Sequence, residues 1–384
     1  MKKLIYLDNA ATTKTSEEVV AAMLPYFTEY YGNPSSVYEF ASESKKAVSN
    51  ARRTIAETLG AQENEIYFTA GGSEADNWAL KATAEAYQSK GKHIITTKIE
   101  HHAILHTAEY LEKRGFEITY IGVDENGVVK VDELEKAIRP DTILISVMFA
   151  NNEIGSIQPI KEIGEIAHKH GVLFHTDAVQ AFGQVPINVD EMNIDMLSSS
   201  GHKLNGPKGI GFLYIRKGVK IRSFVHGGAQ ERKRRAGTEN VPGIAGLGVA
   251  AKMMYQNFDE KVEHLYQLKE RMAEGLSKID DVVINGMPVR EGAPHILSVS
   301  FLGIRSEVLL HTLEDRNIYV SAGSACSSHK RKPSATLSAM GMSNAQIENT
   351  VRISFSEENT FEEVDYCLEV LNEVLPMLKR YARR

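Results

Sequence analysis

The rest of the chain is organised around one short segment, Leu197-Ser198-Ser199-Ser200-Gly201-His202-Lys203. Its pattern is that of a buried strand that opens into a tight turn carrying hydroxyls, an imidazole and a lysine. A lysine at the end of a sheet strand is costly unless its amine is used, and a Schiff base with an aldehyde cofactor is one such use. We therefore hypothesise that Lys203 binds an aldehyde cofactor, with a solvated surface lysine as the alternative.

Strand and helix patterns alternate through much of the chain around this segment. Five strands that are followed at once by polar or glycine residues are expected at 65–69, 93–97, 142–149, 172–176 and 195–199, and a sixth strand at 211–215. Such alternation predicts an α/β fold with a mostly parallel sheet covered by helices on both faces. In a sheet of this kind the ligand lies at the carboxyl ends of the strands. The five turns are therefore expected to meet at one site.

The chain, at 384 residues, is long enough for two hydrophobic cores. Outside the sheet, further elements are expected at 16–31, 41–59, 295–301, 306–316, 351–354 and 361–379, with helices starting near 242 and 259. We place a domain boundary near Asn257 and expect the amino-terminal segment to pack with the last part of the chain. This predicts a large domain over residues 15–257 and a smaller α+β domain over 1–14 and 258–384.

The composition is that of a globular enzyme, with 42% hydrophobic and 24% charged residues. A formal net charge of −6 and a pI near 6.1 argue against a surface that binds nucleic-acid phosphates or anionic membranes. The sequence has no apolar run long enough to cross a bilayer and no signal-peptide pattern. We expect a cytoplasmic enzyme with no direct nucleic-acid or membrane partner.

Two cysteines, Cys326 and Cys367, are too few for a disulfide framework or a thiolate metal cluster. Cys326 lies in a segment of small residues that ends in lysines and arginine, and nearby positive charge biases a thiol toward the nucleophilic thiolate. Cys367 has an apolar position in the last predicted helix and is expected to be buried. We therefore assign reactivity to Cys326.

Gly71-Gly72-Ser73 precedes a helix that we expect to begin at about Glu74. Open backbone N–H groups, the positive end of the helix dipole and a hydroxyl together make a seat for a phosphate. The alternative is an ordinary glycine turn capped by Ser73. The segment matches neither a Walker A loop nor G-x-G-x-x-G, which disfavours a nucleoside triphosphate or a dinucleotide.

Asp177 follows a β-branched and aromatic strand, where an unpaired carboxylate would be costly. A protonated pyridine nitrogen facing Asp177 would offset that cost and let the ring act as an electron sink. With Lys203 and the phosphate seat, this indicates pyridoxal 5'-phosphate. Gln180 is three residues further on and can reach the ring oxygen. The alternative is that Asp177 caps the turn that follows it.

His101 follows another predicted strand and could lie across a planar cofactor or carry protons. The spacing of His101, His102 and His106 could also suggest a metal. No cysteine or clustered carboxylate completes the usual ligand set, so no metal site is predicted. His102 and His106 are expected to share a helix face.

Arg352 and the basic residues 232–235 complete the list of candidate functional residues. Arg352 lies at a strand end, where a guanidinium can bind a carboxylate with two parallel hydrogen bonds, although a surface arginine is the alternative. The basic residues 232–235 allow a nucleic-acid contact, but in an acidic chain they more often form a solvated loop or a local anion contact.

Several blocks spread over essentially the whole chain stand in a distinctive order. The blocks are Tyr6-Leu7-Asp8-Asn9-Ala10-Ala11-Thr12-Thr13, Gly32-Asn33-Pro34-Ser35-Ser36, Glu100-His101-His102-Ala103, Asn151-Asn152-Glu153-Ile154-Gly155, Ser200-Gly201-His202-Lys203, Arg235-Ala236-Gly237-Thr238 and Gly323-Ser324-Ala325-Cys326-Ser327. Together they resemble the cysteine desulfurases of the NifS/IscS type, which are fold-type I pyridoxal-phosphate enzymes of the class-V aminotransferase family. The resemblance implies a seven-stranded type of mostly parallel sheet with a smaller α+β domain.

The resemblance also implies a homodimer that takes sulfur from L-cysteine, releases L-alanine and leaves a persulfide on Cys326. Lys203 would form the Schiff base and move the substrate proton, while His101 would stack on the ring and handle protons. The other implied contacts are Gly72, Ser73, Ser200 and His202 with the phosphate, Thr238 with the phosphate from the neighbouring subunit, Asp177, Gln180 and Asn152 with the ring, and Arg352 and Asn33 with the substrate carboxylate. The loop around Cys326 would swing to a sulfur acceptor, where Cys326 could touch an iron–sulfur cluster transiently.

The sequence departs from the family pattern in a few places. Ser356 stands where a glycine is usual, Ser73 replaces the commoner threonine, and residues 328–332 are unusually basic. The chain also stops soon after its last helix, so both iron–sulfur cluster assembly and tRNA thiolation are retained as destinations of the sulfur. The competing hypotheses are another pyridoxal-phosphate enzyme of the same fold, such as an aminotransferase or a selenocysteine lyase, and a sulfur carrier that acts through Cys326.

Overall fold

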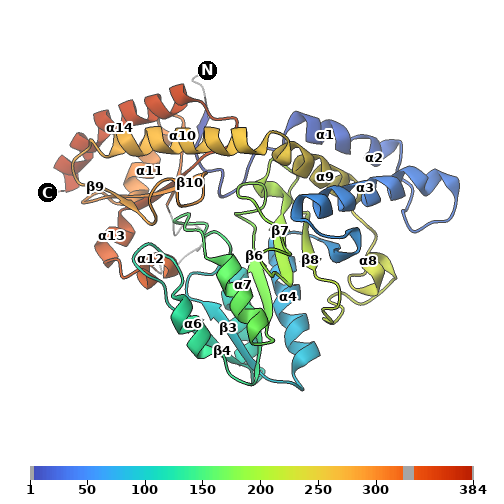
Figure 1. The fold of residues 1–384 in the computed structure, drawn as a ribbon. Coiled ribbons are helices and arrows are strands. Elements are labelled where there is room, and N and C mark those ends of the chain that lie inside the picture. Colours follow the sequence, from blue (N-terminus) through green and yellow to red (C-terminus); the bar gives the residue numbers. More distant parts are fainter. Residues whose placement is uncertain (1–3, 323–332, 383–384) are drawn as a thin grey trace.

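The computed structural model of the protein describes residues 4–322 and 333–382. Cys326, the predicted nucleophile, lies outside these residues. Figure 1 shows a large body built on a central sheet, with a second, smaller group of elements packed above one end of it. None of the described helices combines the length and the apolar character needed to cross a membrane.

The central sheet has seven strands in the order β2-β8-β7-β6-β5-β3-β4. Their bounds are β2 Ile66–Thr69, β3 His93–Thr97, β4 Glu117–Ile121, β5 Thr142–Ser146, β6 Leu173–Asp177, β7 Met196–Ser200 and β8 Gly211–Ile215. Strand β8 runs antiparallel to both of its neighbours, and the other pairings are parallel. The predicted α/β fold with a mostly parallel sheet is therefore confirmed.

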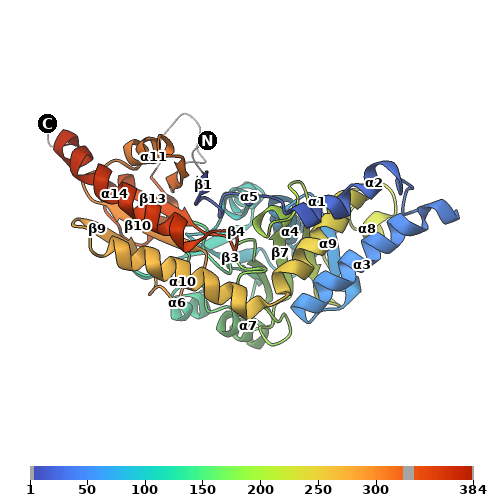
Figure 2. The same ribbon diagram turned by 90° about the horizontal axis from the view of Figure 1, so that it is seen from above.

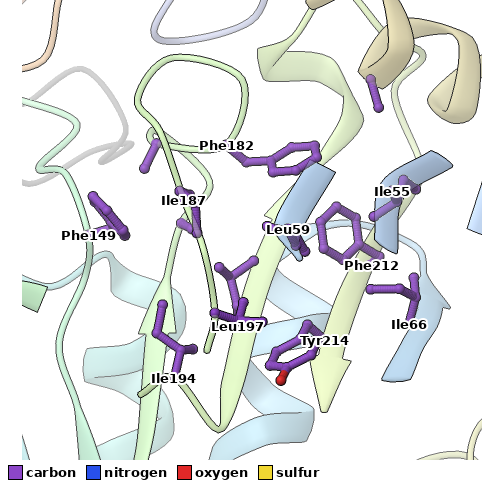
Figure 3. Close-up of a cluster of buried hydrophobic side chains, with 14 of the residues drawn as sticks. Ile55, Leu59, Ile66, Phe149, Phe182, Ile187, Ile194, Leu197, Phe212 and Tyr214 are labelled. Atoms are coloured by element: carbon purple, nitrogen blue, oxygen red, sulfur yellow. The ribbon is translucent and has the colours of Figure 1, made fainter. Parts of the chain in front are cut away.

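Alternate residues of each strand point to opposite faces of the sheet, and helices cover both faces. One face packs against α3 (Ser42–Leu59), α7 (Ile160–Lys169) and α9 (Val241–Tyr255). Figure 3 shows part of this core, where Leu197, Phe212 and Tyr214 lie beside Leu59. The opposite face packs against α4 (Gly72–Tyr87) and α5 (His102–Glu112). The sheet is thus buried on both faces, and its strand ends are left to form the site.

The structure differs locally from the sequence-based expectation in three places. Strand β4 was not predicted, because this edge strand is only partly buried and its residues do not alternate cleanly. The helix expected at 16–31 divides into α1 (Glu17–Met23) and α2 (Pro25–Thr28), because Pro25 cannot donate the backbone hydrogen bond that would continue α1. Helix α4 begins at Gly72 rather than near Glu74.

The smaller group of elements has its own core. A four-stranded antiparallel sheet has the order β12-β13-β10-β9. Its strands are β9 Val282–Asn285, β10 Ile296–Phe301, β12 Ser321–Ala322 and β13 Thr350–Ser354, and the helices packed with it are α10 Phe258–Leu276, α11 Ser306–Glu314 and α14 Phe361–Ala382.

The short α-helices not yet named, from either group of elements, are α6 Val131–Ala137, α8 Gln230–Lys233, α12 Ala335–Ala339 and α13 Asn344–Glu348.

The amino-terminal segment belongs to this second core. Strand β1 (Ile5–Tyr6) pairs in parallel with β11 (Ile318–Tyr319), and Ile5 and Leu7 are buried in the same cluster as α10 and α14. Figure 2 shows β1 between the two groups, and Asp8, which follows β1, forms a parallel bridge with Ser354 of β13. The next residues of the chain run from this core to the ends of the central strands. The domain bounds themselves stay a prediction.

Candidate active site

The ends of β6 and β7 bring the predicted charged residues together. Asp177 is the last residue of β6 and is paired in register with Ser198 of β7, whereas Lys203 follows β7 directly. Asp177 is buried, and its Oδ1 accepts a hydrogen bond of 2.9 Å from the backbone N–H of Val179. Burial raises the pKa of Asp177 above its ordinary value, and the Val179 N–H and the nearby charge of Lys203 offset only part of this rise. A buried carboxylate and an amine thus belong to one electrostatic environment.

Lys203 is held by the amino-terminal segment. Its Nζ donates hydrogen bonds to the carbonyl oxygens of Ala10, at 2.6 Å, and Ala11, at 2.7 Å. The backbone of Thr13 in turn donates a hydrogen bond to the carbonyl of His202, at 2.9 Å. The position of the amine therefore depends on a segment that is distant in the sequence.

The close packing around Gly72, in the predicted phosphate seat, leaves no room for a side chain. Gly71 is the N-cap of α4 and offers no side-chain cap. A Cβ added to Gly72 would lie 2.5 Å from Cγ2 of Val179 and 3.6 Å from Cβ of Ser200. The start of α4 consequently lies against the end of β7, where its free backbone N–H groups could bind an anion. Ser73 does not cap the helix, so the alternative of a turn capped by Ser73 is wrong.

Hydrogen bonds orient the rings of the two candidate histidines, His202 and His101. Burial, with help from Lys203 and Lys208, lowers the pKa of His202 to about 4, so the imidazole is neutral at pH 7. Its Nδ1 lies 3.1 Å from Oγ1 of Thr12. His101 is the N-cap of α5, and its Nδ1 accepts a hydrogen bond from the backbone N–H of Ala103. In its neutral form His101 therefore carries the proton on Nε2.

Two predicted residues hold one another at the edge of the site. Arg352 is buried on β13 and donates hydrogen bonds of 2.7 Å to the carbonyl oxygen of Asn152 and to Oδ1 of Asp8. Its Nε is buried and has no hydrogen-bond partner among the described residues. This arrangement contradicts the alternative of a surface arginine.

Gln180 lies beside the lysine. Its Nε2 donates to the carbonyl oxygen of Ala10, which also accepts from Lys203, and its Oε1 is 3.1 Å from Nε2 of His295. Ser356, where the family pattern has a glycine, donates its backbone N–H to Oδ1 of Asn359 at 2.8 Å. A serine is therefore accommodated in this turn.

Other predicted residues are not joined to the cluster. Asn33 is exposed, and its Oδ1 accepts from the N–H of Ser35. Thr238 is exposed in the loop that precedes α9. Cys367 is fully buried, as predicted, and burial raises the pKa of its thiol to about 12. Since Cys326 lies outside the described residues, its place relative to Lys203 stays a prediction.

Two buried acids at this site were not predicted. Asp76 lies on α4, and a ligand atom from each of Asp76, His101 and Asp177 lies within 4.8 Å of the others. Glu100 is buried, with Oε1 accepting from Oγ1 of Thr97, at 2.7 Å, and from the N–H of Met148, at 2.9 Å. The sequence signal for Asp76 was an acid one turn after the glycines, in a helix whose other buried side chains are alanine, tryptophan, leucine and threonine.

Asp76, His101 and Asp177 have the residue types of a metal site, but their surroundings suit the protonated ring of an organic cofactor better than a metal ion. Burial raises the pKa of the Asp177 carboxyl, and the nearby positive charge of Lys203 offsets part of this rise, while the backbone at Gly72 lies against Ser200. A ring with an anionic substituent would fit these features. We therefore keep the prediction that the cluster serves an organic cofactor.

Comparison with known proteins gives matches over nearly the whole chain. A family model described as aminotransferase class-V matches residues 5–367. The sequence is 56% identical to the cysteine desulfurase IscS of Methanosarcina thermophila over 98% of this chain and 93% of that protein. A solved NifS-like protein is similar with a TM-score of 0.92 and 40% identity, over 98% of this chain and 100% of the other. A structure of SspA in complex with cysteine is similar with a TM-score of 0.81 and 37% identity, over 94% and 100%.

Glu100 gives the site a measurable pH dependence. Burial raises the pKa of Glu100 from 4.5 to about 8, and its Oε2 has no hydrogen-bond partner among the described residues. Between about pH 5 and 8 the folded protein keeps a proton that the unfolded chain has released, so the free energy of unfolding falls as pH rises. We expect Glu100→Gln to remove this part of the fall, as measured by urea unfolding across that range.

The matched control is Glu109→Gln, which changes an exposed glutamate on α5. It should follow the pH dependence of the unchanged protein. Parallel curves for Glu100→Gln and the unchanged protein would contradict a protonated Glu100 at neutral pH.

Proposed function

Because the chain belongs to the class-V aminotransferase family and is a cysteine desulfurase of the IscS type, we propose that Lys203 and Asp177 hold its pyridoxal phosphate and that Cys326 receives the sulfur. Enzymes of this family depend on that cofactor. The observation that carries the proposal is the meeting of the Lys203 amine, the buried Asp177 carboxylate and the bare start of α4 at neighbouring strand ends.

The described residues fit the parts of pyridoxal phosphate. The pyridine nitrogen suits the Asp177 carboxylate, because a protonated ring would compensate its buried negative charge. The phosphate suits the N-terminus of α4 at Gly72 and Ser73, with Ser200 alongside. A neutral His202 keeps one N–H that can donate to a phosphate oxygen.

When bound, the cofactor supplies an electron sink for the bond electrons left at the substrate α-carbon. The chain supplies the proton carriers. Lys203 Nζ is fixed by the Ala10 and Ala11 carbonyl oxygens and serves to move the proton of the α-carbon. His101 donates from Nε2, since its Nδ1 is used by the helix cap.

Arg352 is the proposed partner of the cysteine carboxylate. The carbonyl of Asn152 and the carboxylate of Asp8 fix its guanidinium, and the buried Nε lacks an acceptor among the described residues. A substrate carboxylate would supply that acceptor. Asn33 and the ring contacts of Gln180 and Asn152 are proposed on the family pattern alone.

Lys203→Ala tests the carrier of the proton. The variant should retain affinity for pyridoxal phosphate through the phosphate seat, but alanine formation from L-cysteine should fall by about 10²- to 10⁴-fold or more, because proton transfer is lost. The measurement is alanine released per cofactor bound. The control is Lys208→Ala, which removes an exposed lysine of the same turn. Alanine formation by Lys203→Ala at the rate of this control would reject the assigned role.

The two cysteines provide a matched test of the nucleophile. Cys326→Ala should lower alanine formation by about two orders of magnitude or more, because the substrate sulfur then has no thiolate to attack it. Cys367→Ala should leave turnover nearly unchanged, since this thiol is buried and protonated. If Cys326→Ala released sulfur from cysteine undiminished, an aminotransferase or lyase of the same fold would become the better assignment.

We further propose that the protein is a homodimer. An arm formed by residues 20–40 projects from the body in Figures 1 and 2. It exposes large apolar side chains with exposed fractions from 48% to 102%, namely Leu24, Phe27, Tyr31, Val37, Tyr38 and Phe40. An apolar surface of this kind indicates a protein partner. In agreement with the family pattern, a second copy covering it would place an exposed loop such as that of Thr238 near the partner's site.

Mixed dimers test whether Thr238 acts across the interface. A dimer of Lys203→Ala with Thr238→Val should keep one unchanged site, because the Thr238→Val subunit supplies Lys203 and its partner supplies Thr238. A dimer of the double variant with the unchanged chain should have no unchanged site. The measurement is alanine formation by tagged, purified mixed dimers. Equal turnover of the two, or a monomeric mass in light scattering, would reject the arrangement.

The sulfur is proposed to leave as a Cys326 persulfide for an acceptor protein in the cytoplasm. The IscS relatives support iron–sulfur cluster assembly as the destination. Transfer to a tRNA-thiolation enzyme is the alternative, which the basic residues 328–332 keep open.

A further inference from the structure

Asp76 is a buried acid at the site to which the proposed mechanism assigns no role. It lies on α4 one turn after Gly72, and its side chain is fully buried. It meets the sheet face formed by the ends of β5, β6 and β7, where Asp177, His175 and Ser198 also point. Asp76 therefore lies directly behind the carboxylate assigned to the ring nitrogen.

The neighbouring histidine gives Asp76 no counter-charge. His175 Nε2 is 3.8 Å from Oδ1 of Asp76, but both ring nitrogens are already hydrogen-bonded, to the hydroxyls of Ser146 and Ser198 at 2.9 Å each. Burial lowers the pKa of His175 to about 3, so this imidazole is neutral at pH 7. An ionised Asp76 would therefore be a buried anion without a cation beside it.

Its acidic neighbours make ionisation still less favourable. Asp76, His101 and Asp177 offer ligand atoms within 4.8 Å of one another, and Glu100 adds a further buried carboxyl nearby. Two carboxylates at this distance do not ionise together without cost. Asp177 is the better anion, because it accepts the Val179 N–H and lies near Lys203 and His101. Oδ1 of Asp76 has no hydrogen-bond partner among the described residues, and a hydrogen bond between the Ser198 side chain and the Asp76 carboxyl offsets only part of the cost of ionisation.

We propose that Asp76 is a positioning residue that stays protonated at neutral pH, so that the pair of Asp76 and Asp177 carries one negative charge, located on Asp177 opposite the ring nitrogen. The proposal rests on the assignment of Asp177 to the cofactor. Burial and the charge of Asp177 both raise the pKa of Asp76 well above its ordinary value, in agreement with this geometry. A neutral acid behind Asp177 supplies a polar neighbour without a second charge.

The first test reads the proton directly. Infrared difference spectra between the unchanged protein and Asp76→Asn are recorded at pH 7, with and without added pyridoxal phosphate. A protonated Asp76 should show as a carboxylic-acid C=O band that Asp76→Asn removes, in both samples. Glu85→Gln, an exposed acid of the same helix, should remove a carboxylate band instead. Loss of only a carboxylate band in Asp76→Asn would overturn the proposal.

The second test measures cofactor binding. Asn mimics a neutral acid in shape and polarity, so Asp76→Asn should bind pyridoxal phosphate within about threefold of the unchanged protein. Asp76→Ala removes the polar neighbour of Asp177 and should bind it about 10- to 100-fold more weakly. Equal weakening in both variants would show that the charge of Asp76 is required and would reject the proposal. Failure of the unchanged protein to bind the cofactor would instead reject the proposed function, whatever the infrared result.

Discussion

The site depends on one unfavourable charge, the carboxylate of Asp177, which is buried at the end of a strand covered on both faces. Removing such a group from water is costly unless a cation or hydrogen-bond donor meets it. The chain offers the N–H of Val179 and the charge of Lys203. A protonated pyridine ring would add the remaining compensation. In the proposed complex, the same charge would stabilise the bound cofactor and keep its ring electron-poor.

The two groups of elements meet at the amine of Lys203. Residues 8–13 leave the smaller sheet, where the N–H of Ala10 donates to Oγ of Ser354, and then hold Lys203 through two carbonyl oxygens. Arg352 belongs to the smaller sheet but is fixed by Asn152 from the larger unit. Arg352 and Lys203, the residues proposed to bind the substrate carboxylate and the cofactor, are therefore both positioned by contacts that cross the same junction.

Much of this arrangement could be predicted from local sequence. The strands that end at Asp177 and before Lys203 each begin with apolar residues and end in polar ones, and such polar ends can be grouped into one site because parallel strands share one functional edge. Asp76 and Glu100 were not identified as buried acids of the site, because their burial depends on how α4 and α5 pack on the sheet. Asp8 was likewise quoted only as part of a motif, since its contact with Arg352 spans 344 positions. Long-range contacts of this kind leave no periodic signal.

The most direct test of the central claim is to locate the covalent attachment of the cofactor. The protein is loaded with pyridoxal phosphate, reduced with borohydride, digested and mapped by mass spectrometry. The account predicts one modified lysine, Lys203, and loss of the visible absorption on reduction. Modification of another lysine with Lys203 unmodified, or no stable attachment, would contradict it.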